Sequence, residues 1–159
     1  MTSTQGAHAA GAAGTLTRRA VHGGLGGLAG GVVFGMMMAA MGMLPMVGAL
    51  VGVESAAVGG LVHMGISLLF GVVFGVVITS ARPAPLLLLG AGYGVVLWVV
   101  GALLIMPAML GMPVFMINAM TLQSLVGHLV FGLVAAAAVW LLRRHSGSLD
   151  LGDMRAQHA

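Results

Sequence analysis

The chain has 159 residues, of which 60% are hydrophobic and only 6% are charged. In a soluble domain about a quarter of the residues are charged. This composition therefore excludes a water-soluble globular protein and indicates that lipid surrounds most of the chain. The six basic residues are all arginines and do not form one patch, which argues against a nucleic-acid partner and favours contact with the lipid bilayer. Cysteine is absent, so disulfides and thiolate chemistry are excluded.

Four apolar stretches follow one another along the chain. A low-complexity segment at 1–20, rich in Ala, Gly and Thr, is predicted to be a disordered tail. About 20 apolar residues suffice for a helix to cross a bilayer, and a polar tail at 143–159 closes the chain. The sequence therefore predicts an all-α membrane protein whose domain at 21–142 has four transmembrane helices, at about 21–44, 56–78, 86–106 and 122–142.

The first span contains a row of glycines with four-residue spacing. Such a row makes one helix face without side chains, which lets another helix backbone approach closely in lipid. The row is longer than one hairpin needs, so we expect a homo-oligomer or a membrane-complex partner. The predicted helix-packing residues are Gly23, Gly27, Gly31 and Gly35 here, and Ser67, Gly71 and Gly132 in later spans.

The arginines predict the topology. They precede the first span, occupy the connection between the second and third spans, and follow the fourth, whereas the other two connections have none. The positive-inside rule then predicts cytoplasmic N- and C-termini in the cell (inner or plasma) membrane. Four spans also require both termini to lie on one side, so the two arguments agree.

Two histidines organise the halves of the chain. When His63 is aligned with His128, small residues fall together on either side, and Pro45 and Pro107 end the first helix of each half. This pattern predicts two parallel helical-hairpin repeats. At 1.5 Å rise per residue, both histidines lie roughly 10 Å below the outer surface.

Polar groups at membrane depth are often functional, and three interpretations of the histidines stay open. Both rings can ligate haem b iron. Alternatively, the imidazoles and the thioethers of Met41 and Met109 can hold copper, because soft ligands favour Cu(I). The third interpretation is helix packing through a hydrogen bond to a neighbouring backbone. No spaced metal motif is present, so the sequence does not require a cofactor.

Eleven of the 14 methionines lie at 36–46 and 106–120, at the outer ends of the first and third spans and in the outer connections. Methionine often only fills irregular gaps between helices. No carboxylate lies within a span, since Glu54 is at the outer interface, and this argues against a proton-driven antiporter and a Ser-His-acid enzyme. We therefore expect no enzyme, but a helix-packing or accessory membrane subunit, with a haem- or copper-binding protein as the alternative and a small solute channel or transporter third.

The fourth span carries the motif Gly127-His128-Leu-Val-Phe131-Gly132. With the glycine-rich first span and the His63, Ser67 and Phe70 pattern, it resembles small bacterial four-helix membrane proteins of uncharacterised function, some of which are labelled sodium:proline symporter. The resemblance covers roughly residues 24–142. It implies a four-helix membrane fold in which both histidines matter, and it implies no substrate.

Overall fold

The computed structural model describes the backbone of residues 3–156 and the side chains of residues 11–146. These residues contain helices and no strand. In chain order the helices are α1 (Ser3–Ala40), α2 (Leu44–Ala49), α3 (Ala56–Val77), α4 (Pro83–Leu97), the π-helix η1 (Trp98–Ile105), α5 (Met106–Met109) and α6 (Ala119–Ala156).

Four helical stretches are long and apolar enough to cross a membrane. They are Gly11–Ala40, Ala56–Val77, Pro83–Met109 and Ala119–Ser146. This confirms the predicted all-α, four-helix membrane fold, and the chain is a multi-pass membrane protein.

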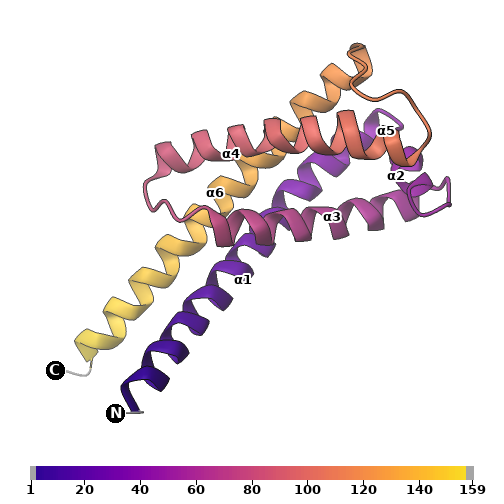
Figure 1. Ribbon diagram of the computed structural model, residues 1–159. Coiled ribbons are helices and arrows are strands. Elements are labelled where there is room, and N and C mark those ends of the chain that lie inside the picture. The colour runs from indigo at the N-terminus through magenta and orange to yellow at the C-terminus, as the bar shows by residue number, and fades with distance from the viewer. Residues whose placement is uncertain (1–2, 157–159) are drawn as a thin grey trace.

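The two long helices form the centre of the bundle. α1 packs against α6, α3 covers α1, and α4 covers α6, so the chain forms two hairpins joined along α1 and α6 (Figure 1). Both termini and the α3–α4 connection lie at one end (Figure 1). This end is here named the arginine end, because Arg18, Arg19 and Arg143 line a cavity there with Thr79 of the α3–α4 connection, which also contains Arg82. α2, α5 and the connection at 110–118 lie at the other end, here named the methionine end.

The boundaries of the first span differ from the prediction at both ends. The segment predicted as a disordered tail is helical from Ser3, consistent with the high helix propensity of its alanines. The span ends at Ala40, not at residue 44, because Gly42 adopts φ +66, and Met43 N donates to Met38 O at 2.9 Å in a Schellman stop. Pro45 lies in the first turn of α2 and does not end the first span.

Pro107 does not end the third span at residue 106, because the helix continues to Met109. Proline has no N–H to donate to the carbonyl four residues earlier, and here Phe115 N donates to Leu103 O at 2.8 Å instead. Phe115 is held at φ 56, the one non-glycine with positive φ among residues 3–156. This bond draws the connection at 110–118 back against η1.

Asn118 and Thr121 cap the start of α6. Thr121 N donates to Asn118 Oδ1 at 3.0 Å, and Asn118 N donates to Thr121 Oγ1 at 2.8 Å. Each side chain thus satisfies one amide that the first helical turn leaves without a partner, which is the reciprocal arrangement of a capping box.

The glycine row of α1 faces α3 within the same chain. A Cβ atom on Gly27 would meet the backbone of Ser67 and Gly71, and one on Gly31 would meet Ser67 Oγ at 2.6 Å. Gly23 lies against Gly71 and Gly75 in the same way. In the second hairpin, Gly90 of α4 lies against Gly132 of α6, so small residues allow close backbone approach in both hairpins.

Candidate functional site

His63 is buried between α3 and α1, with only 7% of its surface exposed. Its Nε2 lies 3.0 Å from Gly31 O, and because a carbonyl can only accept, Nε2–H is the donor. Gly35 leaves room for the ring, since a Cβ there would lie 3.3 Å from His63 Cδ2. In the neutral ring the lone pair is then on Nδ1, which has no hydrogen-bond partner among residues 11–146.

His128 is half-buried on α6 and bonds differently. Its Nδ1 donates to Ser124 O, one turn earlier in the same helix, at 2.8 Å. In the neutral ring this leaves the lone pair on Nε2, for which the described part of the chain supplies no hydrogen-bond donor. A histidine whose one nitrogen donates to a carbonyl has its other nitrogen oriented for a ligand, as in many metal sites.

Phe34 of α1 joins the two histidines. Its ring makes edge-to-face contacts with both imidazoles, with centroids 5.3 Å from His63 and 4.9 Å from His128. All three rings line a cavity of about 390 Å³, here named the histidine cavity, which lies between α2 and α3 on one side and η1 and α5 on the other. The two imidazoles therefore share one cavity and one aromatic neighbour, although they come from different hairpins.

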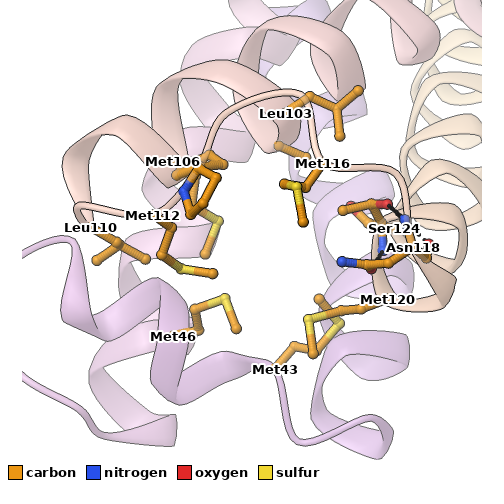
Figure 2. Close-up of a pocket in the computed structure, with 14 residues that line it drawn as sticks. Met43, Met46, Leu103, Met106, Leu110, Met112, Met116, Asn118, Met120 and Ser124 are labelled. Carbon is orange, nitrogen blue, oxygen red and sulfur yellow. Dashed lines mark hydrogen bonds between the residues drawn. The ribbon is translucent and has the colours of Figure 1, made fainter.

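A second cavity, of about 160 Å³, lies at the methionine end and is here named the methionine cavity. Figure 2 shows Met46 of α2 and Met112 and Met116 of the connection at 110–118 pointing toward its centre. The lining side chains that contain oxygen or nitrogen are Asn118, Thr121 and Ser124. The methionines that line it are Met43, Met46, Met106, Met112, Met116 and Met120.

The two cavities adjoin. Met43, Ala102, Met106 and Ser124 line both of them. Ser124 is 7% exposed, and its Oγ lies 3.3 Å from His128 Nδ1, so it connects the methionine cavity with the imidazole. Neutral donors, six thioethers and two imidazoles, are thus grouped in one region of the bundle.

The predicted metal ligands are only partly brought together. His63, His128 and Met109 line the histidine cavity, whereas Met41 lies in the turn after α1 and lines neither cavity. No group of three or more His, Cys, Asp or Glu side chains able to hold a metal occurs among the described residues. Any metal site here would therefore depend on thioethers.

Several residues of the site were not singled out from the sequence. Phe34 looks like one more apolar residue of a span, and Met43, Met46, Met112, Met116 and Met120 belong to methionine-rich runs in which every member looks alike. The feature of the sequence that could have indicated them is the presence of glycines in the connections at the methionine end. In the structure Gly42, Gly52 and Gly111 each adopt a positive φ, which favours a turn. These turns fold the connections back over the helix ends and so determine which methionines contact one another.

The two histidines should differ in their contribution to stability. Replacing His63 with Leu removes a bond between helices, and we expect the free energy of unfolding to fall by about 1 kcal/mol, as for other interhelical bonds in membranes. His128→Leu removes only a bond within one helical turn and should cost less. Thermal unfolding of both variants in mild detergent measures the difference, and equal losses would contradict the assignment of the bonds.

No known protein family, no curated protein and no solved structure matches this chain. The resemblance drawn from the Gly127–Gly132 motif therefore stays a prediction.

Proposed function

We propose that this chain is a non-enzymatic membrane protein that binds a soft monovalent metal ion, with Cu(I) as the best fit. The observation that carries the proposal is the methionine cavity, where six thioethers from both hairpins surround about 160 Å³. Thioether and imidazole ligands select Cu(I) over harder cations. The adjoining imidazoles of His63 and His128 extend the donor set.

The charge of the site favours a monovalent ion. Glu54 is the only carboxylate among residues 11–146, and it lines neither cavity. A buried cation without an opposite charge is costly, and the cost of desolvation grows with the square of the ionic charge. A neutral donor set therefore suits Cu(I) better than Zn²⁺ or Mg²⁺, which are usually held by at least one anionic ligand or several waters.

Haem fits the same residues less well. Axial ligation by both histidines requires one nitrogen of each ring to face a common iron. Nε2 of His63 instead donates to Gly31 O, and both rings pack on Phe34. A porphyrin would have to displace that phenylalanine, whereas a single ion would not.

The glycine row gives no separate argument for an oligomer, because α3 of the same chain occupies it. An accessory role in a membrane complex is compatible with metal binding. The cavities are largely apolar and do not favour a solute channel. By the positive-inside rule, the methionine end faces outward from the cell membrane and would meet the ion there.

The test is Cu(I) binding by the full-length protein in detergent, under reducing conditions, in competition with a chromophoric Cu(I) chelator. Replacing Met46, Met112 and Met116 together with Leu keeps nearly the same volume and removes three thioethers. We expect the affinity for Cu(I) to fall by about 100-fold or more. Loss of a residue that only hydrogen-bonds to a metal ligand already lowers metal affinity by about 10- to 100-fold.

The matched control replaces three methionines that do not line the methionine cavity, Met36, Met37 and Met41, with Leu. This variant should bind Cu(I) like the wild type. If both triple variants lost affinity equally, or if the wild type bound no Cu(I), the proposed site would be wrong, and the methionines would serve only to pack the helix ends.

A further inference from the structure

A third cavity lies at the arginine end and differs in character from the other two. It encloses about 280 Å³ between α1, the α3–α4 connection and α6. Every side chain that lines it is polar or charged, in a chain that is 60% hydrophobic. These residues are Thr15, Arg18, Arg19, His22, Thr79, Arg143 and Ser146.

The lining is cationic. It contains three arginines, and arginine stays protonated in proteins. Glu54, the only carboxylate among residues 11–146, belongs to the α2–α3 connection at the opposite end of the bundle. Among the described side chains, the guanidinium groups of Arg19 and Arg143 and the hydroxyl groups of Thr15, Thr79 and Ser146 line this cavity.

Two of the lining residues are held in place by the fold. Arg143 donates to Ser80 O at 3.1 Å through one terminal nitrogen, and to Gly75 O and Ile78 O at 2.9 and 2.8 Å through the other. A guanidinium has five N–H groups. The three bonds to carbonyls use three of them, so two N–H groups of Arg143 remain for a ligand. Ser146 Oγ donates to Leu142 O at 3.0 Å and accepts from His22 Nε2 at 3.3 Å.

We propose that this cavity binds a phosphate group, carried by the headgroup of an anionic phospholipid or free in solution. Guanidinium groups bind phosphate oxygens through paired hydrogen bonds, and the threonine hydroxyls at positions 15 and 79 can donate to the remaining oxygens. The cavity lies beside the end of α3 and the α3–α4 connection, at the end of the bundle that the positive-inside rule predicts to face cytoplasmic headgroups. Basic pockets between transmembrane helices bind phospholipid headgroups in this position.

The experiment compares lipid retention by the full-length protein and its variants. Protein purified from mixed vesicles of phosphatidylglycerol and phosphatidylcholine is analysed by native mass spectrometry for bound phosphatidylglycerol. We expect Arg19→Gln to reduce retention about fivefold, because one arginine near a lipid surface contributes about 1 kcal/mol. Arg82→Gln is the matched control, since Arg82 is at the same end but does not line the cavity.

A second arm adds inorganic phosphate to the wild type. Displacement of phosphatidylglycerol by inorganic phosphate would support a site for free phosphate, and retention against it would support a lipid headgroup site. Equal retention in the wild type, Arg19→Gln and Arg82→Gln would overturn the proposal, as would equal losses in both variants, because the attraction would then come from general charge. Unfolding in phosphatidylcholine alone checks that each variant is folded.

Discussion

Replacing Gly71 with Ala should separate α1 from α3 and lower the free energy of unfolding by about 3 kcal/mol, at the upper end of the range for overpacked cores. The added methyl group would meet the backbone of Gly23 and Gly27, with Gly27 N only 2.7 Å away. Backbone cannot rotate aside as a side chain can, so the helices must move apart. Thermal unfolding in mild detergent measures the loss.

Gly65 provides the matched control on the same helix. A Cβ there meets nothing within 4 Å, so Gly65→Ala should be neutral or should stabilise by up to about 1 kcal/mol through helix propensity. If the two variants unfolded at the same temperature, the close approach of α1 and α3 would not be the feature that stabilises this hairpin.

The four spans could be predicted from the sequence because their signal is local. A stretch of apolar residues longer than the bilayer is thick has few alternatives to a transmembrane helix. The start of α6 was predictable for the same reason, since Asn118 and Thr121 supply the cap that they bond to. Each of these features depends on residues close together in the chain.

The partner of the glycine row was not predictable in the same way. A row such as Gly23, Gly27 and Gly31 shows that a backbone approaches closely, but it does not show which one. In the structure that backbone is α3, so a contact within the chain accounts for the glycine spacing from which we predicted an oligomer or a membrane-complex partner.

The methionine cavity depends on distant parts of the chain. It forms because two turns fold toward the same space (Figure 2). One brings Met46 of α2 to the cavity, and the other brings Met112 and Met116 of the 110–118 connection. One turn follows the Schellman stop at Gly42, and the other is fixed by the bond from Phe115 N to Leu103 O. Residue spacing along the chain predicts neither turn, because each depends on how the connection folds back onto the end of a helix.

The polar groups that line the methionine cavity differ in kind from those that line the cavity at the arginine end. At the methionine end the donors are neutral and the surroundings are apolar, which suits a soft monovalent ion. At the arginine end the lining combines arginines with hydroxyl groups and His22, and Arg143 bonds the carbonyls at the end of α3. The tests of the two sites can therefore fail independently, because no residue lines both the methionine cavity and the cavity at the arginine end.

Arg143 should be the arginine on which the fold depends most. α3 ends at Val77, and the carbonyls in its last turn lack helical partners. Arg143 supplies three donors, to Gly75, Ile78 and Ser80. Bonds from a charged donor contribute about 1.5–3 kcal/mol each without being additive, so we expect Arg143→Gln to lower the free energy of unfolding by about 3 kcal/mol. Unfolding in phosphatidylcholine without phosphate measures this loss apart from any anion.

Two further variants separate geometry from charge. Arg144 is exposed, with its guanidinium carbon 5.5 Å from the centre of the Trp140 ring, and such a contact is worth about 0.5–1 kcal/mol, so Arg144→Gln should have a small effect. Arg143→Lys keeps the charge but loses the planar group that reaches three carbonyls at once, and it should recover less than half of the lost stability. Full recovery by lysine would mean that Arg143 acts through its charge alone, and that the carbonyls at the end of α3 find other partners.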